Sequence, residues 1–288
     1  MCLRTQVERQ RAMIKDILLA LEVGSARDAA RDYAISVSAA FNAHIAAIGF
    51  AYAPMLPPMD PVSALPLAIL DAERETNRQA ASDAIARFEE AARLAAVSAE
   101  SRLVEASFSD ATNVFGSIAR TFDLSVVGQA EPKSMRDDLM IEGALFDSGR
   151  PVLVIPYIQR AGLKLDRVMA CWDGSRNAAR AINDAMPFLT RAKAVDVVTI
   201  GAGKDRTGEI KGVDIAQHLA RHGLKVELRQ INAGGVDVPN VILSDAADRD
   251  ADFIVMGGYG HSRLREFILG GATRGILLSM TVPTLMSH

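Results

Sequence analysis

Glycines near the end of the chain have the types and the spacing that can bind phosphate. Residues 256–260 read Met-Gly-Gly-Tyr-Gly, and after nine more residues comes Gly270-Gly271-Ala272-Thr273. The apolar run at 253–256 predicts a strand that leads into the first glycines, and residues 273–280 predict a helix after the last ones. Backbone N–H groups at such a helix start, together with the positive end of the helix dipole, can hold a phosphate chain.

Short apolar runs alternate with helical segments along the whole sequence, which predicts parallel strands joined by right-handed crossovers and covered by helices on both faces. We expect strands at 17–21, 45–50, 102–106, 124–127 and 152–155, and again at 168–172, 195–200, 225–230, 253–256 and 283–286. Helices are expected at 26–42, 67–97, 111–121, 135–147, 176–189, 208–222, 238–249 and 273–280.

The order of elements occurs twice, and local sequence matches support a duplication. Gly24-Ser25 resembles Gly174-Ser175, and the run 126–128 (Val-Val-Gly) resembles 255–257 (Val-Met-Gly). Internal repetition of this kind predicts two domains, 1–159 and 160–288, each a five-stranded α/β unit. Open sheets of this type bind ligands beyond the carboxyl ends of their strands, at the point where strand order reverses. The glycine segment follows a strand and is therefore expected at that edge.

Composition is that of an ordinary globular protein, with 49% hydrophobic and 23% charged residues and a formal net charge of −3. This charge gives no general attraction to nucleic acid or acidic membranes, and no apolar run reaches the length of a bilayer span. The residues 1–15 lack the apolar core of a signal peptide. Cys2 and Cys171 give neither a disulfide framework nor metal-ligand spacing. We therefore expect a cytoplasmic protein without nucleic-acid or membrane partners and without a metal site.

A duplicated five-stranded unit with Gly257-x2-Gly260-x9-Gly270 near its end resembles the universal stress protein (UspA-like) family in its tandem-domain form. The resemblance extends over nearly the whole chain after residue 15. It implies two Rossmann-like parallel-sheet sandwiches of the adenine nucleotide alpha hydrolase-like type, related by a pseudo-two-fold axis as an intramolecular pseudo-dimer. It also implies that ATP, or another adenine nucleotide, binds at the glycine segment, with or without Mg²⁺.

The resemblance assigns a role to each matching residue. Asp173 would contact the nucleoside, Thr199 or Ile200 would line the adenine with backbone atoms, and Thr273 would add a hydroxyl near the phosphates. Arg263 is a candidate for neutralising phosphate charge. The residues that we expect around the nucleotide are Asp173, Thr199, Ile200, Met256, Gly257, Gly260, Arg263, Gly270, Gly271, Ala272 and Thr273.

Simpler roles remain open for the same residues. Asp173 suits a turn or helix cap before Gly174-Ser175, the glycines could simply form turns, and Arg263 could belong to a solvated cationic face. The family's pattern has Ser or Thr directly after the third glycine, whereas this chain has Gly271. Loss of one hydrogen bond to a charged group is worth roughly 10- to 150-fold in affinity.

The first repeat departs further from the nucleotide-binding pattern. Gly128 is present, but Glu131 occupies the position of Gly260, and Asp137, Asp138 and Glu142 add negative charge nearby. Because like charges at close range disfavour a polyphosphate, we expect one working nucleotide site, in the second repeat, with the first repeat mainly a packing partner.

No catalytic motif is evident: the sequence has no P-loop, no nucleophile elbow and no dinucleotide fingerprint after the first strand of either half. The best interpretation is a nucleotide-binding regulatory module, and the resemblance supplies its link to stress. Two alternatives remain: a slow ATPase or phosphotransferase that uses the same pocket, and an interaction module that binds no nucleotide. A regulatory protein partner and a homodimer are further expectations.

Overall fold

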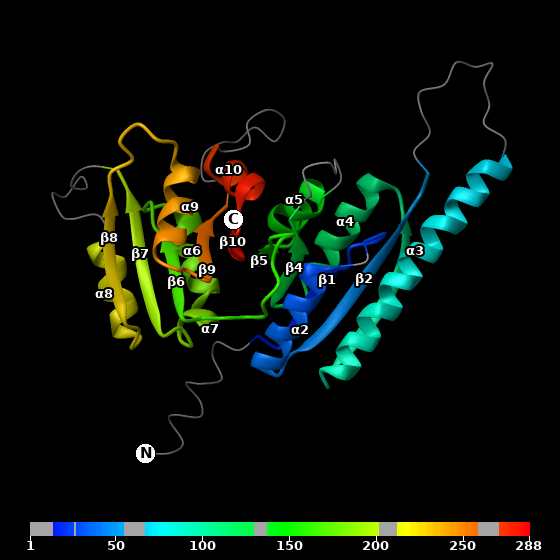
Figure 1. Cartoon of the computed structure of the whole chain (residues 1–288), viewed down its shortest axis with the longest axis horizontal. Coiled ribbons are helices and arrows are strands. Elements are labelled where there is room, and N and C mark those ends of the chain that lie inside the picture. The colour runs from blue at the N-terminus through cyan, green and yellow to red at the C-terminus, as the bar shows by residue number, and fades with distance from the viewer. Residues whose placement is uncertain (1–13, 26, 55–66, 130–136, 202–211, 259–270) are drawn as a thin grey trace.

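The computed structural model describes residues 14–25, 27–54, 67–129, 137–201, 212–258 and 271–288. Their strands form one ten-stranded sheet in the order β3-β2-β1-β4-β5-β10-β9-β6-β7-β8 (Figure 1). The first half supplies β1 (Asp16–Ala20), β2 (His44–Tyr52), β3 (Ala99–Ala106), β4 (Leu124–Gly128) and β5 (Val152–Ile155). The second half supplies β6 (Arg167–Cys171), β7 (Ala194–Ile200), β8 (Val226–Ile231), β9 (Phe253–Gly257) and β10 (Thr284–Ser287).

Helices cover both faces of the sheet. The helices of the first half are α2 (Ala29–Phe41), α3 (Leu67–Leu94), α4 (Phe108–Ala119) and α5 (Asp137–Asp147), and those of the second are α6 (Arg176–Asp184), α7 (Met186–Leu189), α8 (Val213–Arg221), α9 (Val238–Asp248) and α10 (Gly271–Ser279). One core cluster contains α2, α3, α6, α7 and α8 residues, and the other contains α4, α5, α9 and α10 residues. Alternate strand residues enter opposite clusters, for example Ile17 and Leu18.

The predicted fold class is confirmed, with parallel pairing inside each half and helices on both faces. One predicted element needs correction, because the helix expected at 176–189 is divided into α6 and α7 at Ala185. Pro187 lacks a backbone N–H, so it fits the first turn of a new helix and not the interior of a longer one. The helices expected from 135 and from 208 start in the described structure at Asp137 and Val213.

The two halves join through their edge strands. Strand β5 pairs antiparallel with β10, with Val152 opposite Met286, Leu153 opposite Leu285 and Val154 opposite Thr284. Leu153 and Leu285 occupy equivalent positions in the two halves, since Leu153 pairs with Val126 of β4 and Leu285 with Val255 of β9. The pseudo-two-fold axis therefore passes between Leu153 and Leu285, and both edges that would otherwise be unpaired are buried.

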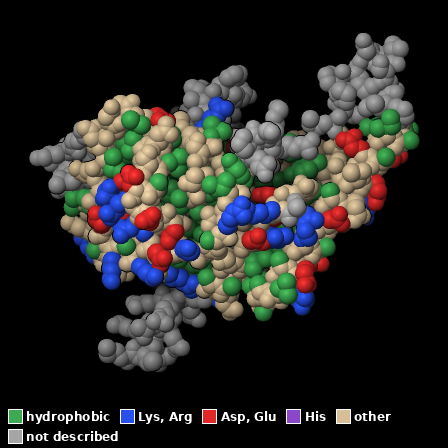
Figure 2. All heavy atoms as spheres, viewed as in Figure 1, with side chains coloured by type: hydrophobic (Ala, Val, Ile, Leu, Met, Phe, Trp, Pro, Cys, Tyr) green, Lys and Arg blue, Asp and Glu red, His purple; other side chains and the backbone are tan. Residues whose placement is uncertain are grey.

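In the second half a buried aspartate forms an ion-pair network with two partly exposed arginines. Asp196 on β7 is 1% exposed, and Arg167 donates to both of its carboxylate oxygens at 2.8 and 3.0 Å. Arg249 bridges Asp196 and Glu227, at 3.3 and 2.7 Å. The strand register places Ala46 at the equivalent position of the first half. Figure 2 shows acidic and basic side chains intermingled on the surface.

The first prediction concerns Leu285→Ala at the seam, by which we mean the antiparallel contact of β5 with β10 between the two halves. Truncating this fully buried side chain is expected to lower the free energy of unfolding by about 3 kcal/mol, because a cavity forms where the two halves meet. Chemical denaturation followed by circular dichroism should show one cooperative transition at lower denaturant. Leu278→Ala, at a side chain that is 60% exposed, is the control and should leave the midpoint nearly unchanged. Two separate transitions, with only one of them shifted, would contradict a shared core.

The network prediction concerns Asp196→Ala. Removing a buried carboxylate leaves Arg167 and Arg249 without their common partner, and we expect a loss of about 3 kcal/mol in denaturant titrations. Glu90→Ala removes one member of an exposed ion pair with Arg93 and should leave the midpoint unchanged. An equally small effect of both substitutions would show that the network does not stabilise the second half.

Candidate functional site

In the second half, the strand order reverses between β6 and β9, and the sequence-predicted residues surround this point. Asp173 lies two residues beyond β6, and Gly257 ends β9, which pairs in parallel with β6. Helix α10 begins at Gly271 in the crossover that follows β9. The structure therefore brings Asp173, Gly257 and the start of α10 to one edge of the sheet, where α/β proteins of this kind bind ligands.

Asp173 takes part in the turn that starts α6. Its Oδ1 accepts a hydrogen bond from the Ser175 backbone N–H at 2.8 Å, and Ser175 Oγ accepts one from the Ala178 N–H at 3.1 Å. This is the turn and cap role that the sequence allowed as an alternative. The Asp173 side chain is also exposed, so the geometry is compatible with a second role toward a ligand.

The predicted adenine-lining residues place their side chains mainly in the core. Thr199 is 2% exposed and its hydroxyl donates to the Arg229 carbonyl at 3.4 Å, while Met256 is 5% exposed. Ile200 is half-buried and packs against the same core cluster as Met256. Contacts from Thr199 and Ile200 to a ligand would therefore come from backbone atoms at the strand end, as the resemblance implied.

Two of the predicted glycines differ sharply in the space around them. A Cβ on Gly257 would lie 2.6 Å from the Ala178 nitrogen and 2.8 Å from the Asn177 carbonyl carbon, so β9 and the first turn of α6 pack backbone to backbone here. Among the described residues, none would lie within 4 Å of a Cβ on Gly271. Close packing against α6 therefore explains why position 257 is a glycine. At position 271, where α10 begins, no other described residue requires a glycine.

Two further predicted residues, Ala272 and Thr273, lie in the first turn of α10. Thr273 is 3% exposed, and Ala272 is half-buried. Gly260, Arg263 and Gly270 lie outside the described residues, as does Glu131 of the first half. Their predicted roles stay predictions.

Contacts at the end of β9 were missed by the sequence analysis. Asn177 in the first turn of α6 is 4% exposed and its Nδ2 donates to the Gly258 carbonyl at 2.7 Å. A Cβ on Gly258 would lie 2.7 Å from Leu145 Cδ2 on α5 of the other half. Asn177 was detectable as a polar residue on the apolar side of a predicted helix, but Leu145 gives no such signal because its contact depends on how the halves pair.

Cys171 lies beside this edge and is a poor nucleophile. Burial above all, together with the nearby carboxylates of Asp173 and Asp245, raises the pKa of Cys171 to about 12. A thiol with so high a pKa stays protonated at neutral pH. The structure therefore assigns Cys171 to packing.

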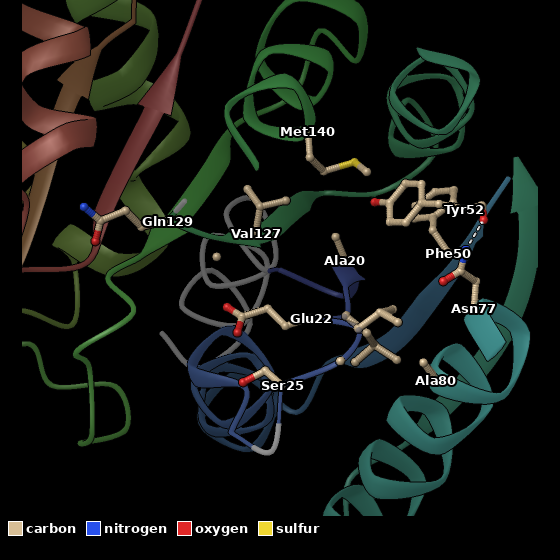
Figure 3. A pocket seen from close by; sticks show the side chains of 14 residues that line it. Ala20, Glu22, Ser25, Phe50, Tyr52, Asn77, Ala80, Val127, Gln129 and Met140 are labelled. Carbon is tan, nitrogen blue, oxygen red and sulfur yellow. Dashed lines mark hydrogen bonds between the residues drawn. The ribbon is translucent and has the colours of Figure 1, made fainter. Parts of the chain in front are cut away.

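The first half contains a cavity of about 510 Å³ at its own strand-order reversal, between the ends of β1 and β4 (Figure 3). This volume lies within the range of small-molecule sites. The sequence analysis expected mainly a packing role for this half and did not identify the cavity. Its lining residues are Ala20, Leu21, Glu22, Val23, Gly24, Ser25, Phe50, Tyr52, Asn77, Ala80, Val127, Gly128, Gln129 and Met140.

The described residues contain no group of three or more His, Cys, Asp or Glu side chains arranged to hold a metal ion. Within the same part of the chain, no helix is both long enough and apolar enough to cross a bilayer.

Comparison with known proteins gives the second half a family. Residues 164–288 match the Universal stress protein family. This match covers the second half and makes that half similar to universal stress protein domains. A curated relative, a universal stress protein of Synechocystis sp., is 25% identical over 138 residues, which are 47% of this chain and 46% of that protein. The match thus spans about half the length of that relative.

Solved structures extend the likeness of fold to both halves of the chain. A universal stress protein from Archaeoglobus fulgidus aligns over 96% of each chain, with a TM-score of 0.74 and 17% identity. A protein of unknown function from Pseudomonas aeruginosa aligns over 95% of this chain and 92% of its own, with a TM-score of 0.58 and 14% identity. At these identities the likeness shows that the tandem fold is shared.

The glycine prediction contrasts Gly257→Ala with Gly271→Ala. The first is expected to lower the free energy of unfolding by about 2 kcal/mol, because the added Cβ forces α6 away from β9. The second should cost nothing and could add up to about 1 kcal/mol, because Ala restricts the unfolded chain more than Gly does. Thermal and denaturant unfolding of the two variants measures this contrast. Equal stabilities would show that the close backbone contact at Gly257 is not formed.

Proposed function

We propose that this protein is a regulatory module that binds an adenine nucleotide, ATP above all, in its second half. The phosphates would lie at the start of α10 and the nucleoside between the ends of β6 and β7, beside Asp173. The observation that carries the proposal is Gly271, where the described part of α10 begins on the edge where β6 and β9 end, and where no other described residue would contact an added Cβ. A helix start attracts anions through its N–H groups and its dipole.

The described residues fit such a ligand at two points. Gly271 leaves room for an approaching phosphate, and the exposed carboxylate of Asp173 lies where a ribose or adenine donor can reach it. The UspA-like character of residues 164–288 supports the same choice of ligand. Bound as a triphosphate, the nucleotide would bring Mg²⁺ with it as a counterion.

Contacts that α10 and the C-terminal residue make with the first half support a regulatory role. Gln129 at the end of β4 donates from Nε2 to the Leu277 carbonyl of α10 at 2.8 Å, and it is 3% exposed. The ring of Phe146 on α5 meets His288 edge to face at 4.9 Å. A nucleotide that stabilises the first turn of α10 would therefore also affect the seam between the halves, which gives occupancy a route to partner binding or to assembly into homodimers.

Gly271→Glu tests the proposal. A carboxylate at this position should preserve the fold, since a Cβ there meets no other described residue and a negative charge suits the first turn of a helix. It should weaken ATP binding at least tenfold by repelling the phosphates, as measured by isothermal titration calorimetry. Adenosine should bind more weakly than ATP to the wild type, because it lacks the charged groups that the helix start attracts.

Leu278→Glu provides the matched control, because it adds the same charge at an exposed position near the other end of α10. It should bind ATP as the wild type does. If wild type and Gly271→Glu bind ATP equally, the phosphates do not lie at α10. If neither binds nucleotide, the protein acts as an interaction module without one.

A further inference from the structure

A second cavity of the first half, of about 350 Å³, lies between the outer strands of the sheet and the carboxyl end of α4. Leu18, Ala46 and Ile48 form its floor on the sheet, and the partly buried side chains of Ile118 and Phe122 form the facing wall. The volume is at the lower end of the range of small-molecule sites. Because these residues lie where the strands begin, the cavity is at the opposite end of the sheet from the proposed nucleotide site.

An acidic and a basic side chain line the same cavity from the edge strand β3. Glu100 and Arg102 lie beside Ala46 and Ile48 in the strand register, so their side chains share the face that forms the floor. The two side chains form an ion pair at 3.8 Å and are 52% and 66% exposed, respectively. An exposed ion pair at this distance contributes little to stability, so a ligand can exchange it for stronger contacts at small cost.

The equivalent space in the second half is crossed by an arginine. Arg249 caps α9 and donates to Asp196 at 3.3 Å and to Glu227 at 2.7 Å. Its counterpart in the first half is Arg120, since each arginine caps its helix and lies four residues before the next strand. Arg120 donates instead to the Asp147 carbonyl at 2.9 Å, on α5.

Two differences between the halves therefore account for the cavity. Ala46 stands at the position of Asp196, and the Arg120 guanidinium is directed toward α5 and not toward the sheet. Glu100 occupies the position of Glu227, because β3 pairs with β2 in the register in which β8 pairs with β7. The first half thus keeps the carboxylate on the edge strand but replaces the buried charges below it with an apolar floor.

We infer that this cavity binds an α-amino acid with an apolar side chain. The ammonium group donates to Glu100, the carboxylate accepts from Arg102, and the side chain packs between Ala46 and Phe122. A ligand with one charge would pair with one of the two protein charges and would place its own charge beside the like charge of the other. A zwitterion pairs with both, and its apolar side chain suits the floor and the wall.

L-leucine and three partial analogues test which parts of the ligand are recognised. Glycine has both charges without the apolar side chain, 4-methylpentanoate lacks the ammonium group, and 3-methylbutylamine lacks the carboxylate. Each is titrated into the full-length wild type and followed by saturation-transfer NMR. We expect leucine to bind at least tenfold more tightly than glycine, because burial of a leucine side chain is worth roughly 10- to 150-fold. It should bind about fivefold more tightly than each singly charged analogue.

Charge-removing substitutions assign each contact to its partner. Glu100→Gln should abolish the preference for leucine over 4-methylpentanoate, and Arg102→Gln should abolish the preference for leucine over 3-methylbutylamine. Glu105→Gln is the matched control, because Glu105 lies on the other face of β3 and pairs with Arg78 at 3.4 Å. It should bind leucine as the wild type does.

Filling the cavity tests the location independently of charge. Ala46→Ile places a larger side chain on the floor and should reduce leucine binding at least tenfold, with the fold checked by circular dichroism and thermal unfolding. Ser117→Leu narrows the cavity from an exposed position on α4, where the fold tolerates the change, and should also weaken leucine binding. Unchanged leucine affinity in both variants would place any leucine site elsewhere and would reject the inference.

The outcomes also separate this inference from the proposed nucleotide site. Gly271→Glu should bind leucine as the wild type does, and Arg102→Gln should bind ATP as the wild type does. The inference is overturned if leucine does not bind at millimolar concentrations, or if leucine and the singly charged analogues bind equally. Loss of ATP binding by Arg102→Gln would overturn the independence of the two sites.

Discussion

The antiparallel pairing of β5 with β10 is the interaction on which the rest of the architecture depends. A five-stranded parallel sheet ends at an edge whose backbone groups need partners, and here each half supplies the partner of the other. Leu153 and Leu285 face each other across the pseudo-two-fold axis and are fully buried. Because both core clusters run through this seam, the two halves share one hydrophobic interior. A ligand or a substitution at the end of β9 or at α10 would therefore lie close to the other half.

Two equivalent strand ends have become chemically different within this common frame. In the second half Asp173 remains in its turn, Gly257 packs against α6, and the start of α10 is left open at Gly271. In the first half Asp28 takes over the turn, and Glu22 reaches across Gly128 into a cavity lined on its far side by aromatic rings. Local changes after a duplication thus leave different side chains at two equivalent strand ends.

The two halves also differ in the charged residues that they carry away from these strand ends. Asp196, Arg167 and Arg249 form a buried network in the second half, at a strand position where the first half has Ala46. A network of this kind keeps its charges only if each is paired, because an isolated buried charge is costly. Substitution of Asp196 is therefore expected to destabilise the second half. The equivalent position in the first half, Ala46, needs only a small apolar residue.

The sequence by itself determined the fold class, the duplication and the placement of most elements, because short apolar runs and helical periods are local properties. It also located the β6 and β9 ends and the start of α10 as candidate site elements. Tertiary structure alone decided that Gly257 is required by packing against Ala178, that Leu145 contacts Gly258 from the other half, and that Glu22 lies over Gly128. These contacts join residues from separate elements whose distance is set by strand order and helix packing. No local pattern in the sequence encodes that distance, so the cavity beside Glu22 became visible only in three dimensions.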